Sequence, residues 1–173
     1  MADPVFSPGL RRAMHDDRHA MGRLFVRSVH GLARESYAPA QLEAWAPVSD
    51  DPPDWITRLE SLECWLLELD GRLAGFIAWK PDGLLDLLFT DPEFARRGVA
   101  SRLLSHMEQT ARRQGWARIV TDASLVARPF FEARGFRQVR AERVKRRGQW
   151  LDRFRMEKTL LGGQEEHEAV TSC

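Results

Sequence analysis

The stretch LLDLLFTDPEFARRGVASRLL, residues 84–104, is the part of the sequence that decides the fold. Its first seven residues, Leu84 to Thr90, form a short apolar run of strand length, and Asp91-Pro92 ends that run. After a loop, apolar residues recur at steps of four, at Val99, Leu103, Met107 and Ala111. This spacing predicts an amphipathic helix from Arg96 to Gln114, which ends at Gly115.

A strand that passes through a short loop into a long helix is suited to bind an anion. The first N–H groups of a helix have no partner within it, and the helix dipole adds positive potential there. Gly98 lets the backbone approach a phosphate, Ser101 offers a hydroxyl, and Arg96 and Arg97 bring positive charge. An ordinary helix after a turn would show the same spacing, so both interpretations stay open on this evidence.

The residues before this stretch predict mainly helices. Asp16 or Asp17 can cap a first helix, whose apolar residues lie at roughly helical spacing: Ala20, Leu24, Val29 and Leu32. Pro39 begins a second, short helix that ends at Pro47. Residues 49–55 form a loop by their turn-forming composition, and a third helix continues to about Glu60.

The remaining elements are mostly strands. Residues 63–69 and 72–79 form a hairpin around Asp70-Gly71, which is a strong hairpin signal. We further expect a strand over 117–122, a helix over 127–134 and closing strands over about 136–144 and 152–160. This order predicts an α/β or α+β sheet with helices on both faces, in one domain over residues 1–161. Residues 162–173 are predicted to be a disordered tail.

The composition excludes several classes of protein. Of the 173 residues, 43% are hydrophobic and 29% are charged, as in ordinary globular domains. The 26 basic and 25 acidic residues balance, so the charge does not favour nucleic acid or a membrane as a partner. No apolar run could span a bilayer or serve as a secretory signal. Cys64 and Cys173 are not expected to pair, and we predict a cytoplasmic protein without a metal site.

Two segments resemble the GNAT superfamily of N-acetyltransferases. The first is similar to that family's acetyl-CoA pyrophosphate loop, whose pattern is Gln/Arg-x-x-Gly-x-Gly/Ala. Here the pattern reads Ala95-Arg-Arg-Gly98-Val-Ala100, so its last three positions match and Ala95 stands where Gln or Arg is usual.

The second segment follows the predicted strand over 117–122. Family members have Asn-x-x-Ala-x-x-x-Tyr-x-x-x-Gly-Phe there, and this chain has Ser124-x-x-Ala127-x-x-x-Phe131-x-x-x-Gly135-Phe136. The spacing is intact, and the resemblance extends over residues 62–160. Two motifs at the right separation are far more specific than either one alone.

The resemblance implies a mixed, mostly antiparallel sheet of about six to seven strands. It implies that acetyl-CoA is the cosubstrate, that it lies between a splayed fourth and fifth strand, and that its acetyl group passes directly to an amine. A backbone amide near Leu88 would polarise the thioester carbonyl. The cofactor-binding residues implied are Leu88, Phe89, Thr90, Arg96, Arg97, Gly98, Val99, Ala100, Ser101, Ser124 and Phe131.

The catalytic groups are less well defined. The family's tyrosine, which protonates the departing thiolate in many members, is replaced by Phe131, and Tyr37 is the only tyrosine in the chain. Asp86 is the candidate base, on the same face as Leu88 if the strand alternates regularly. A carboxylate that faces solvent or an arginine is the alternative for Asp86.

The acceptor site is expected over the connector after the first helix. The residues predicted to bind the substrate are His30, Tyr37, Gln41 and Trp45. Trp45 could equally pack on the sheet. Residues 137–155 contain eight basic and two acidic residues, which fits either a contact for an anion or a solvated hairpin.

We therefore predict an acetyl-CoA-dependent N-acetyltransferase that acts on an amine of a small molecule or a peptide. A catalytically weak acyl-CoA-binding module is the alternative, favoured by Ala95 and Phe131. The sequence leaves open whether the chain forms a homodimer.

Overall fold

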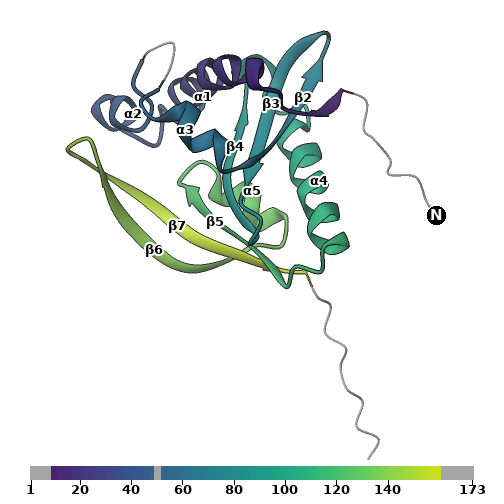
Figure 1. The fold of residues 1–173 in the computed structure, drawn as a ribbon. Coiled ribbons are helices and arrows are strands. Elements are labelled where there is room, and N and C mark those ends of the chain that lie inside the picture. The colour runs from purple at the N-terminus through teal and green to yellow at the C-terminus, as the bar shows by residue number, and fades with distance from the viewer. Residues whose placement is uncertain (1–8, 49–51, 161–173) are drawn as a thin grey trace, which may run out of the picture.

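A seven-stranded sheet runs through the computed structural model, which describes residues 9–48 and 52–160 (Figure 1). The strands are β1 (Leu10–Arg12), β2 (Glu63–Leu69), β3 (Arg72–Trp79), β4 (Leu84–Thr90), β5 (Arg118–Ser124), β6 (Arg137–Arg146) and β7 (Gln149–Thr159). Their order across the sheet is β1-β2-β3-β4-β5-β7-β6. Among these neighbours only β4 and β5 are parallel, so the predicted mixed, mostly antiparallel sheet is confirmed.

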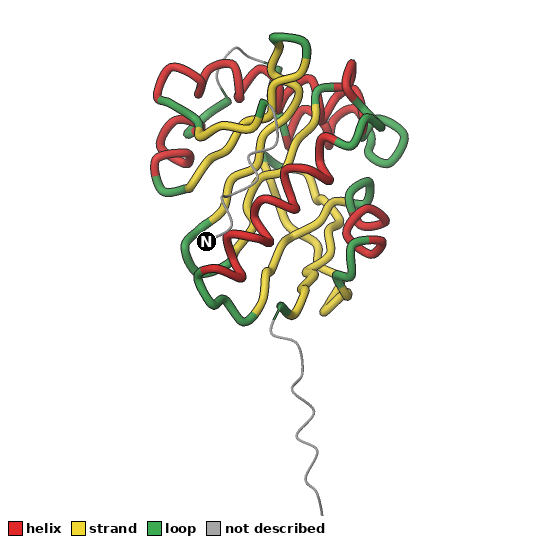
Figure 2. The backbone as a smooth tube through the Cα atoms, turned by 90° about the vertical axis from the view of Figure 1, so that its right-hand side faces the viewer, coloured by secondary structure: helices red, strands yellow, loops and turns green. Residues whose placement is uncertain are grey.

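Helices cover both faces of this sheet. They are α1 (Arg18–Leu32), α2 (Pro39–Trp45), α3 (Trp55–Glu60), α4 (Val99–Arg113) and α5 (Arg128–Ala133), with 3-10 turns η1 (His15–Asp17) and η2 (Pro92–Phe94). Helices α1–α3 lie on one side of the sheet and α4 on the other, and α4 crosses the strands in Figure 2. None of the described helices is both long and apolar enough to cross a membrane.

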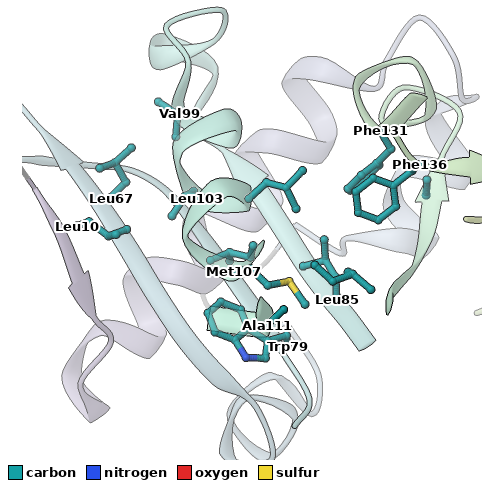
Figure 3. Close-up of a cluster of buried hydrophobic side chains, with 14 of the residues drawn as sticks. Leu10, Leu67, Trp79, Leu85, Val99, Leu103, Met107, Ala111, Phe131 and Phe136 are labelled. Carbon is teal, nitrogen blue, oxygen red and sulfur yellow. The ribbon is translucent and has the colours of Figure 1, made fainter. Parts of the chain in front are cut away.

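Each face has its own buried core. The stripe of α4 that the sequence predicted, from Val99 to Ala111, packs with Phe131 of α5 on Trp79 and Leu85 of the sheet (Figure 3). On the other face, apolar residues of α1, α2 and α3 pack on a second set of sheet residues, which includes Phe76 and Leu87. Helices therefore cover both faces of the central strands, as the order of elements predicted, whereas β6 at the edge is largely exposed.

The element boundaries differ from the predictions where the backbone turns left-handed. Helix α4 begins at Val99 and not at Arg96, because Arg96 and Gly98 have φ angles of 62° and 77°, which a helix excludes. Strand β1 was not predicted, since three residues are too few to show a pattern. The closing hairpin is longer than expected, with β6 and β7 joined at Arg147 and Gly148. The predicted tail, residues 162–173, lies outside the described residues.

Candidate functional site

Strands β4 and β5 pair over a short distance and then separate. Their parallel pairing joins Leu84 to Val120 and Leu85 to Thr121. Beyond this point β4 continues along β3, and β5 continues along β7. The edge of β4 from residue 86 to residue 90 is thus left without a strand partner on the β5 side, and its backbone groups are free to bind an extended molecule.

The direction of those backbone groups follows from the ladder with β3. The amide of Asp91 donates to the carbonyl of Ala74 at 2.8 Å, toward β3. Since successive residues of a strand direct their amides to alternate sides, Leu88 and Thr90 present theirs to the open edge. Both residues are among the cofactor-binding residues that the resemblance implies.

A β-bulge in β4 corrects the expected position of Asp86. Leu87 lies opposite Ala78 and Leu85 opposite Trp79, so Asp86 is an extra residue in the ladder. The bulge shifts the alternation. Leu88 packs with the core under α4, whereas Asp86 contacts Arg58 of α3 on the opposite side. The expectation that Asp86 shares a face with Leu88 is therefore wrong, because one extra residue reverses the side on which the next residues lie.

A cavity of about 420 Å³ opens between β4, β5, the β6–β7 hairpin and helices α1–α3. Its volume is in the range of small-molecule sites. Aromatic side chains line much of it: Phe25, Tyr37, Trp45, Trp55 and Phe89. Phe25 stacks on Trp55 with ring centroids 5.1 Å apart and meets Phe89 edge to face at 4.9 Å. Phe25, Tyr37 and Trp55 are buried, so Trp45 and Phe89 are the aromatic residues that remain partly exposed beside the open edge of β4.

Charged residues of both signs complete the lining. The carboxylates belong to Asp54, Asp86, Asp122 and Asp152. The guanidinium groups belong to Arg58, Arg146, Arg147 and Arg153. Sequence reasoning missed most of these residues, because α3, β5 and the hairpin come together only in the folded chain. The basic run over residues 137–155 was the one signal that pointed to the arginines of the hairpin.

Three of the carboxylates in the cavity are paired with arginines. Asp152 forms an ion pair with Nε of Arg143 at 2.9 Å. Arg58 donates from Nε to Oδ2 of Asp86 at 2.8 Å, and Asp86 makes no hydrogen bond through Oδ1 with any residue that the structure describes. Asp122 is bound by Arg155 at 2.7 Å and lies 3.6 Å from Arg153. Asp86 therefore faces an arginine, which was the alternative to a role as a base, and this ion pair lies inside the cavity.

Tyr37 lies in the cavity wall with its hydroxyl fully engaged. The hydroxyl donates to the backbone carbonyl of Asp152 at 2.7 Å and accepts from the amide of Leu125 at 3.0 Å. Burial raises the pKa of this phenol, and the hydrogen bond from Leu125 opposes that rise. Tyr37 thereby ties the segment between α1 and α2 to β7 and to the loop after β5.

We expect Tyr37→Phe to lower stability more than turnover. Loss of the hydroxyl leaves two backbone groups without their partner, which costs about 1–3 kcal/mol. At this chain length each kcal/mol lowers Tm by about 2–4 °C, which thermal unfolding measures. A fall in kcat of about hundredfold or more at unchanged Tm would instead make Tyr37 the general acid.

The other residues predicted to bind substrate hold helix α2 in place. The Nε2 atom of His30 lies 2.7 Å from the carbonyl oxygen of Ala46. Gln41 accepts from the amide of Ala38 and donates to the carbonyl of Trp150, each at 2.8 Å. Neither His30 nor Gln41 lines the cavity, whereas Trp45 does and meets Tyr37 edge to face.

The start of α4 has the features expected of an anion site. Gly98 precedes the helix with a φ of 77°, and a Cβ atom built there would meet no other atom within 4 Å. The space above the first turn is therefore open to a ligand. The amides of Val99, Ala100 and Ser101 have no carbonyl partner within the helix, because the first such bond runs from Arg102 to Gly98.

Arginines surround this first turn. Arg96 and Arg97 are exposed in the loop, and the guanidinium of Arg97 lies 5.1 Å from the ring centre of Phe94. Arg134, at the end of α5, contacts the hydroxyl of Ser101. Arg134 could not be predicted from the sequence, because it is distant in sequence from Ser101 and reaches α4 only through the position of α5.

A buried carboxylate fixes the loop that leads to α4. Asp91 is 3% exposed, and it accepts hydrogen bonds from Arg27 of α1 at 2.5 Å and from the amide of Glu93 at 3.0 Å. Gly75 of β3 lets α4 approach closely, since a Cβ there would lie 2.5 Å from Val99. The open edge of β4 and the first turn of α4 are thus held in a fixed relation.

Ser124 and Phe131 have different surroundings. The Ser124 hydroxyl accepts from the amide of Ala127 at 3.1 Å, and Ser124 lines the cavity. Phe131 is 3% exposed and packs edge to face on Phe136, with ring centroids 5.0 Å apart.

No group of three or more metal-ligating side chains occurs in residues 9–48 and 52–160.

Comparison with known proteins gives one consistent family. The model of the GNAT acetyltransferase domain matches residues 33–160. YafP, an uncharacterized N-acetyltransferase from Escherichia coli, is 35% identical over 147 residues, which cover 85% of this chain and 93% of that protein.

Solved structures agree with this result. A GCN5-related N-acetyltransferase from Rhodopseudomonas palustris has a TM-score of 0.84 and 31% identity, over 92% of this chain and 100% of that chain. The PaiA N-acetyltransferase from Thermoplasma acidophilum, solved with coenzyme A, has a TM-score of 0.66 and 18% identity, over 87% and 97% of the two chains. The second likeness concerns the fold alone.

Proposed function

Because the chain belongs to the GNAT family of acetyltransferases, we propose that it transfers the acetyl group of acetyl-CoA to an amine bound in the cavity beside β4. The amine belongs to a small molecule or a peptide, and the catalytic domain comprises residues 1–161. One observation carries this proposal: the open edge of β4 joins an anion site at α4 to a cavity lined by aromatic and charged groups.

The residues at the start of α4 fit the pyrophosphate of acetyl-CoA. The amides of Val99, Ala100 and Ser101 would donate to phosphate oxygens, and Arg96 and Arg97 would add positive charge. Ala95 lacks the Gln or Arg side chain of the family pattern, but the backbone donors of Val99, Ala100 and Ser101 remain. The contact between Arg134 and Ser101 places a further guanidinium within reach of the same anion.

The open edge of β4 fits the pantetheine arm. When bound, acetyl-CoA supplies an activated thioester whose acetyl group is transferred. The amides of Leu88 and Thr90 would pair with the arm as a neighbouring strand does. An N–H group near Leu88 that points at the thioester carbonyl stabilises negative charge on its oxygen as the amine attacks.

Asp86 is the residue that we assign to deprotonation of the acceptor. It lies on the cavity side of β4, and its Oδ1 atom makes no hydrogen bond with any described residue. The ion pair with Arg58 holds the carboxylate in place. Cys64 is not used, since burial raises the pKa of its thiol to about 11 and keeps it protonated.

No tyrosine is available to protonate the departing thiolate. Phe131 carries no proton, and the hydroxyl hydrogen of Tyr37 is donated to Asp152. A thiol has a pKa near 8.5, so a thiolate is a tolerable leaving group that water can protonate.

We expect Phe131→Tyr to change turnover by less than about tenfold, the low end of general acid catalysis. Phe131 is buried against Phe136. A new hydroxyl at this position would therefore affect the packing of the core more than it would affect catalysis. Steady-state kinetics with acetyl-CoA and an acceptor amine would measure the effect. A gain of about a hundredfold would show that the enzyme lacks an acid that it needs.

Mass spectrometry of an amine panel tests the proposed function. The purified chain is incubated with acetyl-CoA that carries a deuterated acetyl group, and we expect labelled N-acetyl products. The catalytically weak binding module finds no support in the comparisons, whose named relatives are N-acetyltransferases. A chain that binds acetyl-CoA but labels no amine would contradict the proposal.

A further inference from the structure

The tip of the β6–β7 hairpin brings an arginine into the cavity. Figure 1 shows this hairpin reaching toward α2, and Arg147 at its turn donates to the carbonyl of Ala44 in α2 at 2.8 Å. Arg146, the last residue of β6, lines the cavity together with Arg58 of α3 and Arg153 of β7. A contact between the hairpin and α2 thus helps to hold Arg146 at the rim of the site.

Arg146 differs from the neighbouring arginines of the cavity, because its side chain has no hydrogen-bond or ion-pair partner among residues 9–48 and 52–160. Arg58 binds Asp86, and Arg153 binds Glu142 at 2.9 Å. Arg147 uses Nη1 for the carbonyl of Ala44. Among the residues that the structure describes, the side chain of Arg146 makes no hydrogen bond and no ion pair, and only its backbone pairs with Gln149 in the hairpin.

The surroundings of Arg146 favour an added anion. Burial, and then the positive charges of Arg58, Arg153 and Arg147, lower the pKa of Arg146. Asp86 acts in the opposite direction but is already bound to Arg58. A negatively charged group beside Arg146 would offset this repulsion among like charges. Arg146 is exposed at the rim of the cavity, so a ligand can reach its guanidinium.

Apolar side chains also line the cavity. Phe89 and Trp45 are partly exposed there, and Phe25, which is 4% exposed, packs against Phe89 and Trp55. Val144 and Leu151, which pair across the hairpin, also line the cavity next to the arginine-bearing tip. A ligand that fills this space therefore meets an apolar surface and a guanidinium at the same time.

We propose that the acceptor amine also carries a carboxylate, which Arg146 binds, and an apolar body, which packs on Phe89 and Trp45, the partly exposed aromatic residues of the lining. This inference rests on the proposed function and names its substrate class: a small apolar amino acid or a compound that resembles one. A carboxylate suits a guanidinium because the two planar groups form two parallel hydrogen bonds.

A binding experiment tests the carboxylate site without catalysis. The probe is 3-phenylpropionate, compared by calorimetry with its uncharged amide on protein saturated with coenzyme A. We expect the acid to bind about tenfold or more tightly than the amide, and Arg146→Ala to remove that preference, as expected for a charge-assisted pair. Lys145→Ala is the matched control, since Lys145 is the preceding residue of β6, lies outside the cavity and sits over Trp150.

Kinetics with phenylalanine and phenethylamine, which lacks the carboxylate, form the second arm. We expect Arg146→Ala to lower kcat/KM for phenylalanine about tenfold or more and to leave phenethylamine within about twofold. Equal binding of acid and amide by the wild type, or an unchanged acid preference in Arg146→Ala, overturns the inference. Transfer to phenethylamine in that case leaves the proposed acetyltransferase function standing, so the two failures are distinguishable.

Discussion

Replacement of Gly98 by glutamate is expected to weaken acetyl-CoA binding by more than about a hundredfold in a chain that remains folded. Gly98 stands at the start of α4 with a φ of 77°, and the space that a Cβ would enter contains no other atom within 4 Å. The new carboxylate would occupy the position that we assign to the pyrophosphate and would repel it. Isothermal titration with acetyl-CoA measures the loss.

Gly115→Glu is the matched control for this substitution. Gly115 follows the other end of α4, has a φ of 71°, and likewise has no atom within 4 Å of a built Cβ. Both variants therefore carry a similar strain of about 1–2 kcal/mol and the same added charge. We expect Gly115→Glu to bind acetyl-CoA like the wild type. Unchanged affinity in a folded Gly98→Glu variant would remove the phosphate site from α4.

Asp86→Asn is expected to lower kcat by about 10²–10⁴-fold, the range of general acid–base catalysis, with little change in acetyl-CoA affinity. Asparagine keeps the shape of the side chain, and its carbonyl oxygen can still accept from Arg58. What is lost is the group that takes the proton of the acceptor amine. Steady-state kinetics at one pH would measure the loss in kcat, and titration calorimetry would measure the affinity for acetyl-CoA.

Asp82→Asn controls for the change of charge near β4. Asp82 lies in the turn before that strand, where it accepts from the amide of Leu84 at 3.2 Å, and it does not line the cavity. We expect this variant to retain the turnover of the wild type. If Asp86→Asn also retained it, then Asp86 would be a partner of Arg58 and not a base.

The sequence predicted the elements whose signals are local. The hairpin at Asp70-Gly71 and the apolar stripe of α4 both depend on neighbouring residues, and the structure contains each of them. Family membership was predicted from two motifs at a fixed separation, and the match over residues 33–160 confirmed it.

The acceptor side of the site could not be predicted in the same way. The side on which Asp86 lies depends on one extra residue in the ladder with β3, and strand alternation gives no sign of it. Arg58 and Arg146 come from α3 and β6, which meet only when the hairpin reaches α2. His30 and Gln41 were predicted from their residue types, but their side chains bond to the backbone of Ala46 and Trp150.

Release of the thiol of coenzyme A tests the central claim most directly. The purified chain is supplied with acetyl-CoA, and thiol formation is followed with and without an amine such as phenylalanine or phenethylamine. The proposed function predicts that the thiol appears only when an amine is present, and that Gly98→Glu abolishes this release while Gly115→Glu preserves it. A wild-type chain that binds acetyl-CoA and releases no thiol with any amine would contradict the claim.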